Sequence, residues 1–387
     1  MKKILYAVQG TGNGHVSRAR AILPRLGKEA EVDVAISGTN SEVTLDRTTR
    51  YTYHGLSYTF GKTGGIDYFS SFCNFRPLRF LSDLRNLPVK DYDFVISDFE
   101  PVSAWAARRA GVPCIGMSHQ ASFFSQRTPR PPRRSRTGEL IFRHYAPCNH
   151  AIGFHYKSYD DFILTPVIQD SIRKWKKVAD QNPKRQNFHR YTGITGSTSL
   201  LESRHTDTVH GGFGRHVTVY LPAWDDSYLV PVLRQISGVE WQVFSKTAAR
   251  LFKEKNVTVS PVDTEAYQAS LAGSIGLVCG AGFEAPSEAM YLGKPVMVIP
   301  MNNQYEQLCN AEALRRMGVT VCEITKWTLV DQLLFLRSLD HWLVHGIPVP
   351  VNYPDITEVV ISRILNIAEM KNFGKTAVYQ SSRLAAY

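Results

Sequence analysis

Long apolar runs are missing from this sequence of 387 residues. No stretch approaches the roughly 18 to 20 consecutive apolar residues that cross a bilayer as a helix. The apolar run near the N-terminus, Ile4–Val8, is followed at once by glycine-rich polar sequence. It therefore favours a buried first strand over a signal peptide or a membrane anchor. We expect a cytoplasmic protein.

Cysteine patterns that would indicate disulfides or zinc are also missing. The six cysteines form no Cys-x-x-Cys pair, and several lie in apolar runs, which predicts reduced thiols in the core. The His and Cys residues between positions 144 and 155 do not have the spacing of zinc ligands. Asp91-Tyr-Asp93 precedes its strand, where a turn is the expected structure. We expect no metal and no cofactor.

Acidic residues are outnumbered, 34 against 45 Lys and Arg, and the formal net charge is +11. Such a charge suits nucleic acid, lipid headgroups or a polyphosphate substrate. Nucleic acid is disfavoured because no binding motif is present and aromatic residues do not interleave with the basic ones. The basic loop Arg127–Arg136 contains prolines that prevent regular structure. We expect it to be exposed and to contact the inner membrane face or a phosphorylated acceptor, with a plain solvated loop as the alternative.

Strand-like and helix-like segments alternate in two stretches of the chain, which predicts an α/β fold with two parallel sheets. Between about residues 123 and 210 this alternation is lost, and we expect irregular structure there. The predicted domains are a Rossmann-like domain over 1–155, an irregular basic connecting segment over 156–215, a second Rossmann-like domain over 216–350, and a terminal helix with a tail over 351–387.

The first candidate site is the loop Gly10-Thr-Gly-Asn-Gly-His15, which follows a strand and opens a helix. Its glycines let backbone N–H groups approach an anion, and the helix N-terminus adds roughly half a positive charge. The spacing is not G-x-G-x-x-G and no acidic residue ends the second strand, so a dehydrogenase-type dinucleotide site is disfavoured. His15, held neutral by the helix dipole, is a candidate general base. The alternative is a hydrogen bond to a neighbouring loop.

Three more polar residues end strands on the same predicted edge of the first sheet. Asp98 and Glu100 close one strand, and either carboxylate could be the general base or could orient His15 or His119. The alternative for Asp98 is to cap the helix that begins near Pro101. His119 ends the next strand and is a further candidate for substrate contact.

The second candidate site begins at Cys279-Gly-Ala-Gly-Phe-Glu, where a buried strand passes directly into a helix. Backbone N–H groups of Gly280, Ala281, Gly282 and Phe283 are predicted to bind a diphosphate. Glu288 follows on the helix, where a carboxylate can accept both ribose hydroxyls. Gln307 and Asn310, after the next strand, return amides that suit sugar hydroxyls. The alternative is a plain strand–turn–helix with a solvated Glu.

This second segment, continued by Gly293-Lys-Pro295 and Asn302–Gln307, resembles the donor signature of GT-B-fold glycosyltransferases. The loop ending in His15 is similar to their N-terminal signature. The nearest resemblance is to glycosyltransferase family 28, which includes the peptidoglycan N-acetylglucosaminyltransferase and the galactolipid synthases. The stretches 96–101 and 116–120 look like an uncharacterised bacterial and archaeal subgroup. The resemblance covers about residues 1–120 and 215–325.

The resemblance implies a donor site on the C-terminal domain, an acceptor site on the N-terminal one facing it across a cleft, and a last helix, 356–370, that crosses back. It implies that Glu288 binds ribose, that Gln307 binds the donor sugar, and that Gly12, Asn13, Gly14 and His119 lie on the acceptor side. One departure concerns the phosphate contacts. Leu221-Pro-Ala-Trp224 replaces the Gly-Gly-Ser turn of the best-known members.

The predicted reaction is metal-independent transfer of a sugar from a nucleotide diphosphate sugar, with a UDP-sugar favoured, to an acceptor hydroxyl with inversion. His15, Asp98 or Glu100 would take the proton. Two alternatives stay open: a nucleotide-sugar epimerase of the same fold, and a non-catalytic nucleotide-sugar-binding protein. A nicotinamide oxidoreductase is a third hypothesis, which we do not expect to hold.

Overall fold

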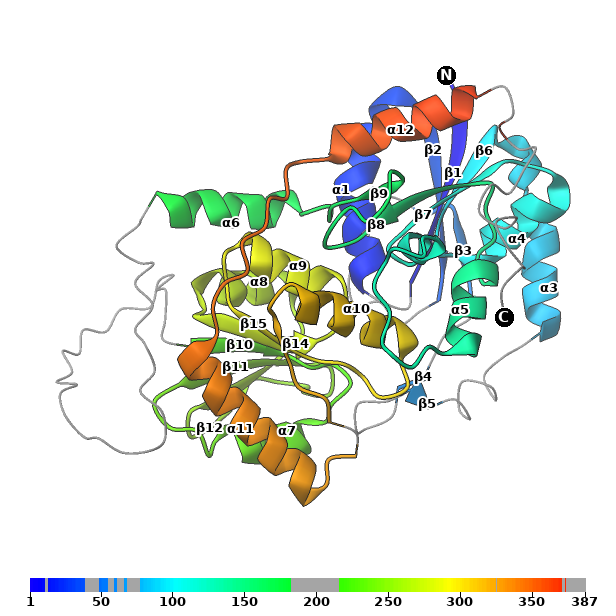
Figure 1. The fold of residues 1–387 in the computed structure, drawn as a ribbon. Helices are drawn as coiled ribbons and strands as arrows, with labels where there is room; N and C mark the ends of the chain where they lie inside the picture. Colours follow the sequence, from blue (N-terminus) through cyan, green and yellow to red (C-terminus); the bar gives the residue numbers. More distant parts are fainter. Residues whose placement is uncertain are drawn as a thin grey trace. The chain divides into compact units, whose positions relative to one another are not determined.

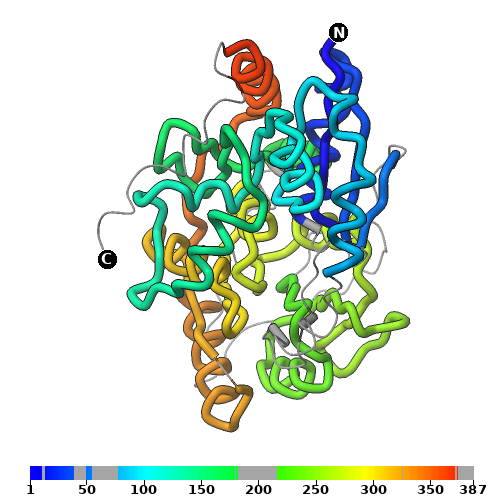
Figure 2. Tube along the Cα trace, turned by 90° about the vertical axis from the view of Figure 1, so that its right-hand side faces the viewer, coloured from blue at the N-terminus to red at the C-terminus, as the bar shows by residue number. Residues whose placement is uncertain are grey.

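The computed structural model describes residues 1–10, 13–38, 49–54, 59–60, 66–67, 77–181, 216–324, 326–370 and 373. The chain forms two compact units (Figure 1). The first unit draws on residues 1–59, 67–169 and 353–387, and the second on 60–66 and 170–352. Each unit alternates strands with helices, which can be followed by colour along the tube in Figure 2.

The first unit is built on a seven-stranded sheet in the order β3-β2-β1-β6-β7-β8-β9. Every neighbouring pair is parallel. The strands are β1 (Lys3–Gln9), β2 (Glu31–Ser37), β3 (Tyr51–Tyr53), β6 (Phe94–Asp98), β7 (Cys114–Ser118), β8 (His150–Phe154) and β9 (Ile163–Leu164). Residues of β6 and β7 are buried throughout, as expected for strands covered on both faces.

Helices connect these strands. They are α1 (Asn13–Glu29), α3 (Pro77–Asn86), α4 (Pro101–Ala110) and α5 (Arg136–His144), with short 3-10 turns at Val89–Asp91 and Gln120–Phe124. The chain adds β2 on one side of β1 and β6 on the other. In such sheets the point where the order reverses leaves a crevice outside the carboxyl ends of the strands, where ligands bind.

The second unit repeats this plan in the order β12-β13-β11-β10-β14-β15-β16. All pairs are parallel except the edge pair of β12 and β13. The strands are β10 (His216–Tyr220), β11 (Glu240–Ser245), β12 (Phe252–Glu254), β13 (Val257–Pro261), β14 (Gly276–Gly280), β15 (Val296–Ile299) and β16 (Thr320–Val321). The helices are α6 (Asp170–Asp180), α7 (Asp226–Leu233), α8 (Thr264–Gly273), α9 (Glu284–Tyr291), α10 (Tyr305–Arg316) and α11 (Leu329–His345).

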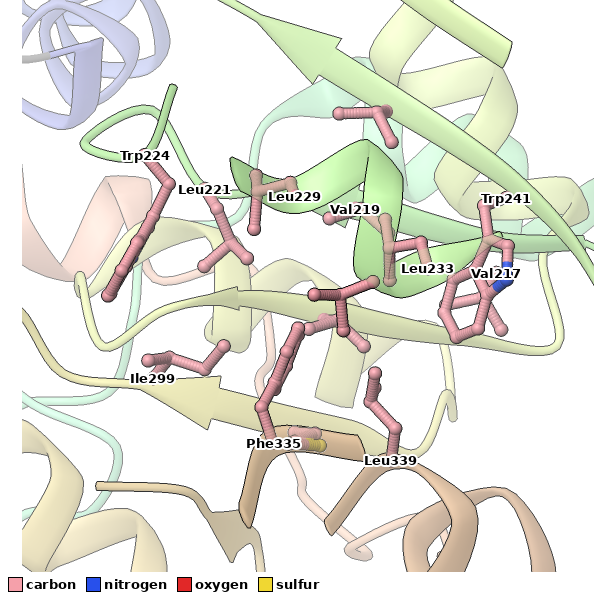
Figure 3. Packing of buried hydrophobic residues seen from close by; sticks show 14 of the residues in the cluster. Val217, Val219, Leu221, Trp224, Leu229, Leu233, Trp241, Ile299, Phe335 and Leu339 are labelled. Atoms are coloured by element: carbon pink, nitrogen blue, oxygen red, sulfur yellow. The ribbon is translucent and has the colours of Figure 1, made fainter. Parts of the chain in front are cut away.

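The core of the second unit lies between its sheet, α7 and α11. Figure 3 shows side chains of β10, α7, β15 and α11 meeting there, among them Leu233, Ile299 and Phe335. Close packing of α11 requires a glycine in β14, because a Cβ at Gly276 would lie 2.8 Å from the ring of Trp342. The order of strands again reverses at β10, so the carboxyl ends of β10 and β14 border the position where such sheets bind ligands.

The last helix, α12 (Thr357–Glu369), belongs to the first unit, as predicted. It packs on α1. Arg25 of α1 binds Asp355 at 2.9 Å, and Arg363 donates to the carbonyl of Asp161 at 2.6 Å. The chain therefore leaves the first unit, forms the second, and returns.

The prediction of irregular structure between residues 123 and 210 was wrong where the structure describes it. The helices α5 and α6 and the strands β8 and β9 lie in this region. β8 is paired on both sides, with β7 and β9, and is buried after its first residue. Its short sequence, His-Ala-Ile-Gly-Phe, contains two residues that weaken a strand pattern. Residues 182–215 lie outside the described part of the chain.

The basic loop Arg127–Arg136 is exposed only in part, which corrects a second prediction. Arg130 is 5% exposed and donates hydrogen bonds to the carbonyls of Phe123, Ser125 and Thr128. It also pairs with Glu139 at 3.0 Å. One arginine of the basic run therefore fixes the loop from inside, while Arg127, Arg133, Arg134 and Arg136 are exposed.

The start of α4 is fixed by Glu100. Its two carboxylate oxygens accept hydrogen bonds from the backbone N–H groups of Val102 and Ser103 at 2.7 and 2.6 Å. The prediction that Pro101 opens this helix and Gly111 ends it is confirmed, since Gly111 adopts the left-handed conformation with φ of 71°. The alternative in which Asp98 caps the helix is wrong, because Glu100 occupies that position.

We expect Glu100→Ala to lower the free energy of unfolding by about 2 kcal/mol, because it leaves two buried N–H groups without an acceptor. Urea unfolding followed by circular dichroism measures this. Glu358→Ala is the matched control, since Glu358 lies in the first turn of α12 with a 75% exposed side chain. Equal stability of the two variants would contradict the capping role.

Candidate active site

A histidine–aspartate pair lies at the carboxyl edge of the first sheet. His15 is in the first turn of α1, directly after β1, and Asp98 is the last residue of β6. β1 and β6 are neighbours, with Val8 opposite Asp98. The His15 Nδ1 atom lies 2.7 Å from Asp98 Oδ1. The structure therefore brings together two of the predicted catalytic residues, and the predicted alternative that Asp98 orients His15 has this geometry.

A third residue, which sequence reasoning did not select, completes the cluster. Arg18, one helical turn after His15, donates to Asp98 Oδ2 from Nε at 2.9 Å and to Oδ1 from Nη2 at 2.8 Å. Its guanidinium lies 5.2 Å from the centre of the Phe154 ring. The available signal was the i, i+3 spacing of His15 and Arg18, which places both on one face of the helix.

Asp98 is fully buried and ionised in this setting. Burial alone would raise the pKa of its carboxyl group, but the charge of Arg18 and the contact with His15 outweigh burial and lower the pKa below its ordinary value. Tyr6 of β1 also faces this carboxylate. Burial, and then the charge of Asp98, raise the pKa of the Tyr6 hydroxyl well above its ordinary value, so the phenol is neutral.

The backbone after Asp98 is strained. Phe99 has a positive φ of 53°, a conformation that aromatic residues rarely adopt. Its ring packs against Tyr145 at 4.7 Å between ring centres. The strained residue separates two carboxylates with different tasks, since Asp98 contacts His15 whereas Glu100 caps α4. Strain of this kind is often found at functional sites.

The other predicted residues of the first unit whose side chains the structure describes do not join this pair. Glu100 has both oxygens engaged by the start of α4, so the structure favours Asp98 as the acidic partner of His15. His119 is 2% exposed, its Nδ1 lies 2.8 Å from the carbonyl of Phe154, and its ring packs against His155. Gly14 lies in the first turn of α1. Gly12 lies outside the described residues, as does the side chain of Asn13.

The second unit presents the predicted glycine turn at the carboxyl end of β14. β14 ends at Gly280 and α9 begins at Glu284, so Ala281, Gly282 and Phe283 form the whole connection. A Cβ added at Gly282 would meet no heavy atom within 4 Å, so the backbone is open on that side. A helix N-terminus with an open glycine turn is a site for anionic groups.

Glu288 lies on α9, just beyond this turn. The residue is only 6% exposed. Tyr267 of α8 is close to it. Burial raises the pKa of the Tyr267 hydroxyl well above its ordinary value, and the charge of Glu288 raises it further. The ring of Tyr267 contacts Tyr220, the last residue of β10, at 5.4 Å. Glu288 is therefore near the carboxyl edge where β10 and β14 end.

The two predicted amides approach the same turn from α10. Asn310 is fully buried and its Nδ2 donates to the carbonyl of Ala281 at 3.0 Å. Gln307 Oε1 accepts from the N–H of Met301 at 2.9 Å, and its amide would be in contact with a Cβ placed at Gly280. The predicted residues of the donor side therefore gather around one turn, and Asn310 fixes the conformation of that turn.

Two kinds of feature are absent from the described residues. These residues contain no group of three or more His, Cys, Asp or Glu side chains with a geometry suited to a metal ion. No helix in the described part of the chain is both long and apolar enough to span a bilayer.

Two Rossmann-like units, with the last helix returning to the first, are the architecture of the GT-B fold. A family model described as glycosyl transferase family 1 matches residues 2–147 and 204–336. Because the match covers more than half of the sequence, the chain belongs to glycosyl transferase family 1. The predicted fold class is confirmed.

A solved structure with a TM-score above 0.5 supports this fold. MurG of Acinetobacter baumannii aligns with 16% identity and a TM-score of 0.53, over 95% of this chain and 100% of that one. SnogD from Streptomyces nogalater aligns with 13% identity and a TM-score of 0.48, over 95% and 99%. UGT89C1 of Arabidopsis thaliana, complexed with UDP, aligns with 11% identity and a TM-score of 0.49, over 96% and 100%. No curated protein matches the sequence.

Because Asp98 is buried and ionised, the free energy of unfolding should depend on pH in the acidic range. Its lowered pKa contributes stability above the unfolded value of roughly 3.9, and this stability is lost as the pH falls through the folded pKa. We expect Asp98→Asn to be less stable by about 3 kcal/mol at pH 7. Its stability should fall less steeply than that of the wild type below about pH 4. Urea unfolding at several pH values measures both, and parallel acid slopes would contradict the ionised state of Asp98.

Proposed function

We propose that this glycosyltransferase is a hexosyltransferase that moves a sugar from a nucleotide diphosphate sugar, with UDP as the favoured carrier, to an acceptor hydroxyl. The proposal depends most on one observation, the open Gly282 turn that leads into α9 with Glu288 close behind it. The turn suits a diphosphate and the carboxylate suits a ribose diol. The preference for UDP comes from the family resemblance in the sequence.

In the proposed mechanism the acceptor hydroxyl attacks the anomeric carbon, and the bond from that carbon to the diphosphate oxygen breaks. His15 takes the hydroxyl proton through Nε2, since Nδ1 faces Asp98. Asp98 stabilises the imidazolium that forms, as the acidic partner of a catalytic histidine does. The start of α9 stabilises the negative charge on the leaving diphosphate without a metal ion. A single displacement of this kind inverts the anomeric centre.

The two alternatives differ from transfer in what they require. An epimerase of this fold would need no acceptor, and a nucleotide-sugar-binding protein would need no base. The His15–Asp98 pair favours transfer, because it gives the first unit a proton acceptor that a binding protein does not use. Incubation with donor alone, followed by analysis of the sugar, separates epimerisation from transfer.

The anionic acceptor or surface is proposed to meet the exposed arginines of the basic loop: Arg127, Arg133, Arg134 and Arg136. Arg130 is excluded because it is buried and bonded to the loop itself. α5 follows this loop and exposes Leu140 beside further basic residues, Arg143 and His144. Basic side chains near an anionic bilayer gain about 1 kcal/mol each. We propose peripheral contact with anionic lipid at the inner membrane face.

We expect Glu288→Gln to weaken donor binding by about 100-fold, because the amide replaces one of the two charged accepting oxygens with an NH2 donor. A thermal-shift screen of nucleotide diphosphate sugars identifies the donor, since ligand at a hundred times its Kd adds about 2.7 kcal/mol of stability. Titration calorimetry then compares the variants. Glu265→Gln, an exposed change on α8, is the control. If no nucleotide sugar raises the melting temperature of the wild type, the proposed function is overturned.

Reversing the charge of Arg133, Arg134 and Arg136 to Glu should lower binding to vesicles of phosphatidylglycerol at least tenfold, because three favourable charges become unfavourable. Vesicle sedimentation at low and physiological salt measures this. The control reverses three exposed residues of the second unit, Lys246, Arg250 and Lys326. If the control loses as much binding, net charge rather than this loop determines the contact.

A further inference from the structure

Arg18 occupies an unusual position for an arginine. Its side chain is 2% exposed, and it binds both oxygens of Asp98, which is itself fully buried. The Phe154 ring covers the guanidinium. A guanidinium is always charged in proteins, and its planar fork fits a carboxylate in this two-bond manner. Arg18 and Asp98 therefore form a permanent buried ion pair.

His15 meets this pair from one side. Its Nδ1 lies 2.7 Å from Asp98 Oδ1 and 3.2 Å from Arg18 Nη2, which binds the same oxygen. Because Asp98 is ionised, Nδ1 carries the hydrogen and donates it. The His15 side chain is 14% exposed, whereas Asp98 is not exposed. The opposite edge of the ring, with Nε2, is then the edge that can reach a substrate.

Arg18 already supplies a positive charge in direct contact with Asp98, without any charge on His15. The groups that lower the pKa of this carboxyl most are Arg18 and His15 of α1, and Tyr6 of β1 lies near it. Tyr6 is neutral, and the Phe154 ring of β8 packs on the Arg18 guanidinium. One anion therefore faces one fixed cation. A second positive charge on His15 would lie 3.2 Å from the guanidinium and would be repelled.

We propose that Arg18 is a positioning residue that serves as the permanent counter-ion of Asp98 and thereby keeps His15 uncharged, with Nε2 ready to accept a proton. The inference rests on the proposed role of His15 as general base. It assigns opposite effects to the two neighbours of the imidazole. Asp98 sets the tautomer and favours the imidazolium as it forms during reaction, whereas Arg18 prevents the imidazolium from forming before the acceptor arrives.

The test is nuclear magnetic resonance of the full chain labelled with nitrogen-15 at histidine. The His15 signals are assigned by their loss in His15→Gln, and their shifts report protonation and tautomer. In the wild type at pH 7 we expect a neutral ring with hydrogen on Nδ1. An imidazolium in the wild type would overturn the inference without the use of a variant of Arg18.

Variants separate charge from packing. Arg18→Met removes the cation while keeping a long side chain, so His15 should become the counter-ion of Asp98 and be mostly imidazolium at pH 7. Arg18→Lys keeps a cation and should keep His15 neutral. The double variant Arg18→Met with Asp98→Asn removes both charges and should return His15 to the neutral form. A neutral His15 in folded Arg18→Met would overturn the inference, as would an imidazolium in the double variant.

Transfer kinetics distinguish this inference from the proposed function. In Arg18→Met, kcat at pH 7 should fall at least tenfold and recover towards higher pH, while KM for the donor stays unchanged because Arg18 is not at the donor turn. If the wild type binds no nucleotide sugar, the proposed function fails. The spectroscopic test of Arg18 does not depend on that outcome. If kcat of Arg18→Met falls equally at every pH, Arg18 serves only to stabilise the fold.

Discussion

Both candidate sites depend on one constraint, the way in which a parallel sheet exposes the ends of its strands. Among the parallel strands of each sheet, the strand order reverses beside β1 in the first unit and beside β10 in the second. The strands cannot pair further at their carboxyl ends, so the chain turns there into a helix and leaves polar backbone at the edge. His15 follows β1, Asp98 ends β6 and the Gly282 turn follows β14. The order of the strands therefore determines where both candidate sites lie in their units.

The two sites solve the cost of buried charge differently. In the first unit a carboxylate is buried completely and is satisfied by three hydrogen-bond donors from two side chains. In the second unit the charge to be bound is expected to arrive with the ligand, and the protein offers an open turn with the buried carboxylate of Glu288 near it. A site with its charges already paired is rigid, whereas a site that waits for a ligand can be more open.

The alternating part of the fold could be predicted from the sequence, because a continuous apolar strand followed by a glycine turn and an amphipathic helix is a local pattern. α4 matched at both ends, since Pro101 and Gly111 have conformational preferences that act within a few residues. β8 was missed because its stability comes from burial between β7 and β9, which no local pattern shows. Arg130 was assigned to the surface for the same reason, since its partners are backbone carbonyls that only the folded loop brings together.

The candidate catalytic residues show the same division. His15 and Asp98 could be selected because each stands at the end of a predicted strand, although they are 83 positions apart. Choosing between Asp98 and Glu100 needed the strained Phe99, which turns two nearby carboxylates to different partners. The role of Arg18 was invisible in the sequence, where it is one of many basic residues. Its role depends on the Asp98 carboxylate, which is distant in the sequence.

The return of α12 to the first unit affects how this chain can fold during synthesis. All described segments of the second unit between Asp170 and Asn352 leave the ribosome before the helix that packs on α1. The second unit can therefore complete its core while the first still exposes the apolar face of α1. The half of the molecule that contains the N-terminus is, in this respect, the last to be finished.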